Sequence, residues 1–159
     1  MEFQKKIEEI KSGKLSPIYI VQGKEDYLQN WARQVFLESV VAPEDQELNV
    51  ARFNMEEISV QTAIEDAESV PFFGDRRLVM IDKPYFLTGE KEKAKIDHQL
   101  ERLQFYLENP LESSVVVFFA PYEKLDARKK IVKQLKKVAV LLDASSLDEK
   151  DVRAMVQSK

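Results

Sequence analysis

Apolar and polar residues follow two different spacings along the chain. Short apolar runs, such as SPIYIV at residues 16–21 and RLVMID at residues 77–82, are typical of strands that are buried on both faces. Longer segments between them carry apolar residues three or four positions apart, which is typical of amphipathic helices. Strands are expected at residues 16–21, 47–54, 77–82, 113–120 and 138–144. Helices are expected at residues 3–11, 26–40, 59–70, 88–109 and 126–137.

Local signals predict where several of these helices begin, end and face the core. Ser59 and Asp126 are expected as N-caps, because their side-chain oxygens can accept hydrogen bonds from the first free backbone N–H groups. Pro110 is expected to end the helix that precedes it. The helix over residues 26–40 is expected to bury a stripe formed by Tyr27, Leu28, Trp31, Val35 and Phe36.

The alternation of strands and helices predicts the fold class. Parallel strands need long crossover connections, and helices that serve as crossovers cover both faces of the sheet. We therefore expect an α/β domain with three layers and a five-stranded, mainly parallel sheet over residues 1–145. The sequence SLDE at residues 146–149 has the form of a capping box and is expected to open a further helix over residues 146–159.

Composition and charge narrow the function classes. The 159 residues contain no apolar run near the roughly 18 residues of a membrane span, and they contain no cysteine. The single histidine, His98, is expected at the surface of a charged helix without a special role, and no metal site is expected. A net charge of −4 disfavours a domain whose main task is to hold nucleic acid. A protein is the expected partner.

The turn after the first strand is the first place to look for phosphate chemistry in an α/β sheet, and Gly23 and Lys24 occupy it. A phosphate-binding loop also needs an earlier glycine and a Ser or Thr after the lysine, where this chain has Glu25. The fourth strand likewise ends in Ala120 and Pro121 instead of acids that orient magnesium. We expect a degenerate phosphate loop and no bound cofactor.

The alternative function is a nucleotide-dependent kinase or hydrolase in which Lys24 acts with Glu123 or Asp126. A second alternative is a plain structural scaffold that makes no contact with such a partner protein. The basic helix over residues 126–137 is expected to be an ordinary amphipathic helix with a solvated outer face, because its apolar residues keep helical spacing.

Phe72 and Phe73 lie side by side in the stretch ESVPFFGDRR. Pro71 interrupts the helix before them and Gly74 permits a tight turn after them. Adjacent side chains point in different directions, so both rings are not expected to enter the same core. At least one ring is expected to be exposed, and with Val70 the pair has the composition of a protein-binding hot spot. The alternative is that both rings belong to the core at a corner between helix and strand.

Four segments taken in order resemble the N-terminal domain of the delta subunit of bacterial DNA polymerase III, a clamp-loader subunit. They are PIYIVQGKEDYL, SVPFFGDRRLVMID, LENPLESSVVVFFAPYEKLDARKKIVKQLKK and LDEKDVRAMV. The resemblance covers essentially the whole chain. It implies a non-catalytic domain similar to those of AAA+ ATPases (P-loop NTPase-like) with a decayed nucleotide site, in agreement with the departures at Gly23–Glu25 and Ala120–Pro121.

The resemblance also implies a partner for Phe72 and Phe73. In this family a helix followed by a small-Leu-Phe-small segment enters an apolar pocket of the sliding clamp, the polymerase's beta subunit. Phe72 falls at the leucine position, which is a departure from the commonest residue, Phe73 at the phenylalanine and Val70 at a nearby apolar contact.

The remaining implications concern the rest of the replication machinery. Residues 146–159 would lead to a lid domain absent from this chain, and other clamp-loader subunits would be contacted through such absent regions. ATP hydrolysis would occur in those other subunits, DNA would be contacted only within the assembled loader, and the location would be cytoplasmic, without membrane contact.

Overall fold

The computed structural model describes residues 2–71, 75–89 and 96–145 of the chain, and its centre is one parallel sheet. The strands are β1 (Ile18–Gln22), β2 (Val50–Asn54), β3 (Arg77–Asp82), β4 (Ser114–Ala120) and β5 (Val140–Asp143). Their order across the sheet is β2-β3-β4-β1-β5, and each neighbouring pair is parallel. The predicted five-stranded parallel sheet is therefore confirmed.

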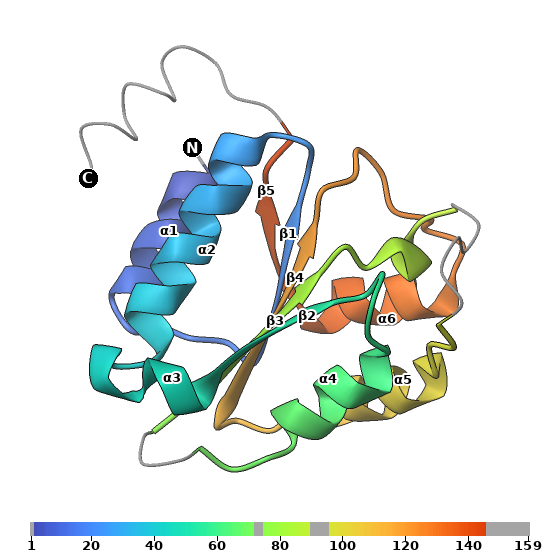
Figure 1. Cartoon of the computed structure of the whole chain (residues 1–159). Helices are drawn as coiled ribbons and strands as arrows, with labels where there is room; N and C mark the ends of the chain where they lie inside the picture. Colours follow the sequence, from blue (N-terminus) through green and yellow to red (C-terminus); the bar gives the residue numbers. More distant parts are fainter. Residues whose placement is uncertain (1, 72–74, 90–95, 146–159) are drawn as a thin grey trace.

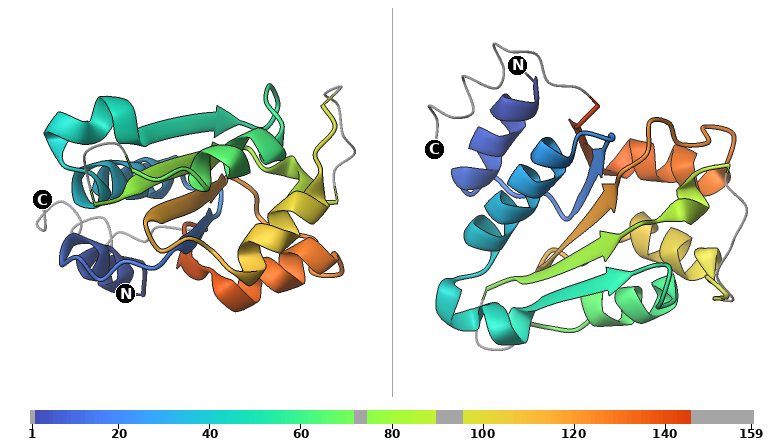
Figure 2. Two further views of the ribbon diagram at one scale, coloured as in Figure 1. Left: turned by 90° about the horizontal axis from the view of Figure 1, so that it is seen from below. Right: turned by 45° about the horizontal axis from the view of Figure 1, so that its top comes forward.

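Helices cover both faces of this sheet (Figures 1 and 2). They are α1 (Glu2–Lys11), α2 (Asp26–Val40), α3 (Gln46–Asn49), α4 (Val60–Ala67), α5 (Leu100–Glu108) and α6 (Lys130–Val138), with two short 3₁₀ helices at Pro43–Asp45 and Tyr85–Leu87. Helices α1 and α2 lie against one face, and α4, α5 and α6 lie against the other (Figure 1). This arrangement is the predicted three-layer α/β architecture.

The core consists of two apolar clusters, one on each face of the sheet, because side chains alternate along each strand. Ile18 and Ile20 of β1 join the cluster under α4, α5 and α6, whereas Tyr19 and Val21 join the cluster under α1 and α2. The adjacent pair Phe118 and Phe119 of β4 is buried in the same way, with one ring in each cluster. Each fully buried apolar side chain of this size contributes roughly 1.5–3 kcal/mol to folding.

Two helices begin later than predicted. Residues 96–99 are not helical, so α5 covers only Leu100–Glu108 of the expected helix over residues 88–109, of which residues 90–95 lie outside the described part. Helix α6 begins at Lys130, and Asp126 does not cap it. The Asp126 carboxylate instead accepts hydrogen bonds from the backbone N and Nε of Arg128, at 3.0 and 3.1 Å, which hold a turn before the helix. These bonds keep the pKa of Asp126 below its usual value.

The prediction that His98 is a surface residue without a role is wrong. His98 is partly buried, and its Nδ1 accepts a hydrogen bond from the backbone N of Val60, at 3.0 Å. Its Nε2 lies 2.9 Å from the Met55 carbonyl oxygen and 2.9 Å from the Tyr85 hydroxyl. His98 thus caps the first turn of α4, while Ser59, at the N-cap position, directs its hydroxyl to Thr62.

Trp31 and Tyr27 of α2 were both expected to be buried, and they differ in exposure. Trp31 belongs to the core, with 6% of its surface exposed, as predicted. Tyr27 of the same helix was expected to be buried but is 37% exposed.

The capping box at residues 146–149 lies outside the described residues. Among the described helices, none is long and apolar enough to cross a membrane.

Candidate functional site

The corner between α4 and β3 carries the predicted partner-binding residues. Helix α4 forms because Val60, Ala63, Ile64 and Ala67 make one stripe that is fully buried against the sheet. It ends at Ala67, and Pro71 disfavours helical backbone at Val70. Val70 is 74% exposed, a large fraction for an apolar side chain. Phe72 and Phe73 lie outside the described residues, so the structure places Val70 alone of the three.

An ion pair fixes this corner to the first residue of β3. The Arg77 guanidinium donates two hydrogen bonds to the Asp66 carboxylate of α4, at 2.9 Å from Nε and 2.7 Å from Nη2. Both side chains are largely buried, with 14% of Arg77 and 22% of Asp66 exposed, and hydrogen bonding to Asp66 raises the pKa of Arg77 above its ordinary value. Arg77 also donates to the Leu48 carbonyl oxygen at 3.1 Å.

Two further contacts hold the end of α4. The Ser114 hydroxyl of β4 donates a hydrogen bond to the Ala67 carbonyl oxygen at 2.5 Å, and Arg102 of α5 forms an ion pair with Glu68. The residues at the end of α4 that make these contacts precede Phe72 in the chain, and Arg77 follows Phe73. The described residues on either side of the pair are therefore anchored to β3, β4 and α5.

The turn after β1 differs from a phosphate-binding loop in where its backbone N–H groups point. The Gly23 N–H donates to the Ala120 carbonyl oxygen and the Glu25 N–H to the Ala144 carbonyl oxygen, each at 3.0 Å. Gly23 has a φ of +141°, and a Cβ placed on it would lie 2.1 Å from the backbone carbon of Ala144. The glycine is needed for this close backbone approach, and the N–H groups of Gly23 and Glu25 bind the protein's own carbonyl oxygens instead of facing a ligand.

Gln29 of α2 closes the same turn from inside. Its Nε2 lies within hydrogen-bond distance of three backbone carbonyl oxygens, those of Val21, Gly23 and Ala120, at 3.1, 2.9 and 3.3 Å. Gln29 is buried, whereas Lys24 is exposed on the outer side of the turn.

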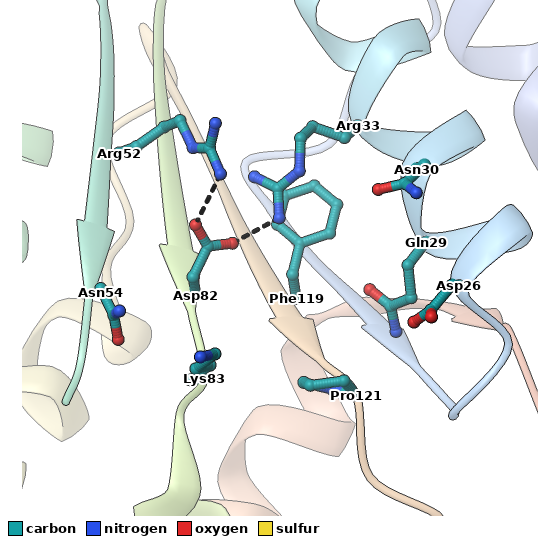
Figure 3. Close-up of a pocket in the computed structure, with 10 residues that line it drawn as sticks. All are labelled: Asp26, Gln29, Asn30, Arg33, Arg52, Asn54, Asp82, Lys83, Phe119 and Pro121. Carbon is teal, nitrogen blue, oxygen red and sulfur yellow. Dashed lines mark hydrogen bonds and ion pairs between the residues drawn. The ribbon is translucent and has the colours of Figure 1, made fainter.

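A polar cleft of about 350 Å³ lies beside this turn at the carboxyl ends of the strands (Figure 3). It is lined by Asp26, Gln29, Asn30, Arg33, Arg52, Asn54, Asp82, Lys83, Phe119 and Pro121. Asp82, the last residue of β3, lies 2.5 Å from Nη2 of Arg33 and 3.3 Å from Nη2 of Arg52. The Arg33 guanidinium also lies over the Phe119 ring, 4.1 Å from its centroid. Asp82 was not predicted as a site residue, because no local signal links it to Arg33, 49 positions away in the chain.

This cleft does not assemble the residues of the alternative enzyme hypothesis. Neither Lys24 nor Glu123 nor Asp126 lines it. Its central carboxylate, Asp82, is already compensated by two guanidinium groups, which a magnesium ion would have to displace. Within the described residues, no group of three or more His, Asp or Glu side chains is placed to hold a metal ion.

The fold is that of an α/β domain of the AAA+-like class. The expected fold class is supported by a solved structure of a DNA polymerase III gamma subunit-related protein from Thermotoga maritima, with a TM-score of 0.58 at 14% identity. That likeness covers 100% of this chain and 50% of the other, and at this identity it concerns the fold alone.

More specific matches identify the family. The sequence profile described as DNA polymerase III, delta subunit, matches residues 19–145. The DNA polymerase III subunit delta of Bacillus subtilis is 44% identical over 142 residues, which cover 89% of this chain and 41% of that protein. The solved structure of the Bacillus subtilis DNA clamp loader delta protein has a TM-score of 0.86 at 42% identity, over 93% of this chain and 44% of the other.

The chain belongs to the DNA polymerase III delta subunit family, as the sequence resemblance implied. It spans less than half the length of the Bacillus subtilis relatives that it matches.

Proposed function

We propose that this chain is the clamp-binding domain of a clamp-loader delta subunit, which binds the DNA sliding clamp and helps to open it for loading during replication. Membership of the delta family supports the assignment, since the matched Bacillus subtilis structure is named a clamp loader delta protein. The observation that carries it is the corner after α4, where Val70 is 74% exposed beside residues anchored to three neighbouring elements.

In this proposal Val70, Phe72 and Phe73 enter an apolar pocket of the clamp, and the domain itself performs no catalysis. The internal hydrogen bonds of the turn after β1 support the second part, because the N–H groups of Gly23 and Glu25 are bonded to Ala120 and Ala144. Residues 1–145 form the AAA+-like domain, and residues 146–159 begin the connection to the lid domain. Contacts with other loader subunits belong to regions beyond this domain, and DNA is met only within the assembled loader.

A double substitution tests the proposal. Phe72→Ala with Phe73→Ala removes two aromatic anchors, each worth about 2 kcal/mol or more, so affinity for the sliding clamp should fall roughly a thousandfold. Calorimetric titration with the clamp measures this loss. The melting temperature of the double variant should stay close to that of the unchanged chain.

The same experiment separates the interface from a core role. Truncation of core phenylalanines costs about 3–5 kcal/mol each, which is enough to unfold many domains of this size. A double variant that keeps its affinity, or that loses it only because it has unfolded, contradicts the proposed clamp contact. The variant Phe118→Ala, which truncates a buried ring of β4, provides the reference for a core loss.

A further inference from the structure

A second exposed apolar surface lies beside the corner after α4. Phe105 of α5 is 70% exposed, and Leu111, in the loop between α5 and β4, is 36% exposed. They border a groove of about 350 Å³. Its lining consists of Glu68, Phe105, Tyr106, Glu108, Asn109 and Leu111.

The groove and Val70 lie at the same edge of the molecule. Residues 68–76 lead into β3 and residues 109–113 lead into β4, and these two strands are neighbours whose first residues, Arg77 and Ser114, are paired in register. Helices α4 and α5 pack together and both end at this edge (Figures 1 and 2). Glu68 belongs to both surfaces, because it lines the groove and lies two residues before Val70.

The exposure of Phe105 is not required by the packing of α5. The buried face of this helix is formed by Leu103, Tyr106 and Leu107, and Phe105 lies off that stripe. A large aromatic side chain that leaves most of its surface in water contributes little to folding, whereas aromatic residues dominate the binding energy of protein interfaces. Its position therefore points to a partner protein.

Contacts within the chain itself hold the floor of the groove in place. Tyr106 is 3% exposed, and its hydroxyl accepts a hydrogen bond from the backbone N of Leu111 at 3.3 Å. This bond ties the loop after α5 back to the helix. On the other wall, the ion pair between Arg102 and Glu68 fixes α5 to the end of α4. A preformed groove of this kind lowers the ordering cost of binding.

We infer that the clamp-binding surface extends from Val70 across α5, so that Phe105 and Leu111 bury apolar surface of the same sliding clamp. This inference rests on the proposed function. The clamp is the occupant because Glu68, which lines the groove, lies two residues before the exposed Val70, at the same edge of the sheet. The last described residue, Ser145, lies at the opposite edge of the sheet, because it follows the carboxyl end of β5.

The test is calorimetric titration of the sliding clamp with single variants of this chain. Phe105→Ala should weaken binding roughly ten- to thirtyfold, as expected for an aromatic anchor near the centre of an interface. Leu111→Ala, at the margin of the groove, should weaken it about threefold. The control is Ile58→Ala, since Ile58 is 37% exposed and lies at the other edge of the sheet, after β2. It should leave the affinity unchanged.

Each outcome decides between the two proposals. If the unchanged chain does not bind the clamp, the proposed function and this inference fall together. If Phe72→Ala with Phe73→Ala abolishes binding while Phe105→Ala and Phe105→Glu both keep it, the inference alone is wrong. Sedimentation of the unchanged chain supplies the last arm. Self-association that Phe105→Ala removes would assign the groove to a second copy of the chain and overturn the inference.

Discussion

The two edges of the sheet present opposite kinds of surface. At the carboxyl edge, the turn after β1 and the cleft around Asp82 contain many polar groups, and the principal ones are bonded to one another. At the amino edge, Val70 and Phe105 leave 74% and 70% of their surface exposed. The edge at which α/β sheets usually bind small ligands is thus internally satisfied, and the surface suited to a protein partner lies at the other end of the strands.

The difference follows from what each edge offers. Helices begin near the carboxyl ends of parallel strands, where their free N–H groups favour anions. In this chain the turn before α2 binds the N–H groups of Gly23 and Glu25 to the carbonyl oxygens of Ala120 and Ala144. Helices end at the amino edge, where recognition must depend on the side chains of connecting loops. The exposed apolar residues Val70 and Leu111 lie in such loops.

The strongest test of the carboxyl edge is the substitution Gly23→Ala. A Cβ at this position would lie 2.1 Å from the backbone carbon of Ala144, at a φ of +141° that residues with a side chain rarely adopt. Backbone strain and overpacking each cost about 1–3 kcal/mol, so the free energy of unfolding should fall by about 3 kcal/mol or more. Thermal unfolding should then show a melting temperature lower by roughly 6–12 °C.

Gly13→Ala is the matched control for this change. Gly13 also has a positive φ, of +91°, but a Cβ there would meet no atom within 4 Å. It should therefore cost only the backbone strain, about 1–3 kcal/mol. Equal losses for the two glycine variants would show that the close approach to Ala144 has no special role in closing the turn.

At the amino edge, Arg77→Gln should produce the next largest effect. The substitution removes a largely buried ion pair with Asp66 and leaves that carboxylate without its two charged donors. We expect a loss of about 2 kcal/mol in stability, or roughly 4–8 °C in melting temperature. Clamp affinity should also fall several-fold, because the pair fixes the corner that carries Val70.

Arg128→Gln is the control for the ion-pair prediction. The Arg128 side chain is 90% exposed, so its pair with Asp126 is screened by water and its removal should leave the melting temperature unchanged. If Arg77→Gln behaves like Arg128→Gln in both stability and affinity, the corner does not depend on its anchor to β3.

The fold was predictable because β1, β3 and β4, at the centre of the sheet, are buried on both faces and therefore appear as apolar runs. The helix over residues 88–109 was predicted too long, since the spacing of Ile96, Leu100 and Leu103 continues the helical pattern. Residues 96–99 are not helical, and His98 among them is bonded to the backbone of Val60 and lies beside the Met55 carbonyl oxygen. Such contacts over 38 and 43 positions leave no local signal in the sequence.

The candidate site was predictable in part. The turn residues around Phe72 and Phe73 pointed to an exposed corner, and the exposure of Val70 agrees with it, although the pair itself remains a prediction. Asp82 was missed because its partner Arg33 is 49 positions away in the chain. Phe105 had a usable signal, because it falls outside the stripe of Leu103 and Leu107, but an aromatic residue on an amphipathic helix is easily taken for core.

The smallest expected effect belongs to Lys24→Ala. Lys24 is exposed between Gly23 and Glu25, whose N–H groups are bonded within the chain, and it does not line the cleft around Asp82. Clamp affinity and melting temperature should both remain within error of the unchanged chain. Millimolar ATP with magnesium should not raise the melting temperature of either protein, whereas a ligand at a hundred times its dissociation constant would add about 2.7 kcal/mol. A clear rise that Lys24→Ala removes would mean that the carboxyl edge still binds nucleotide, and the contrast between the two edges would then be wrong.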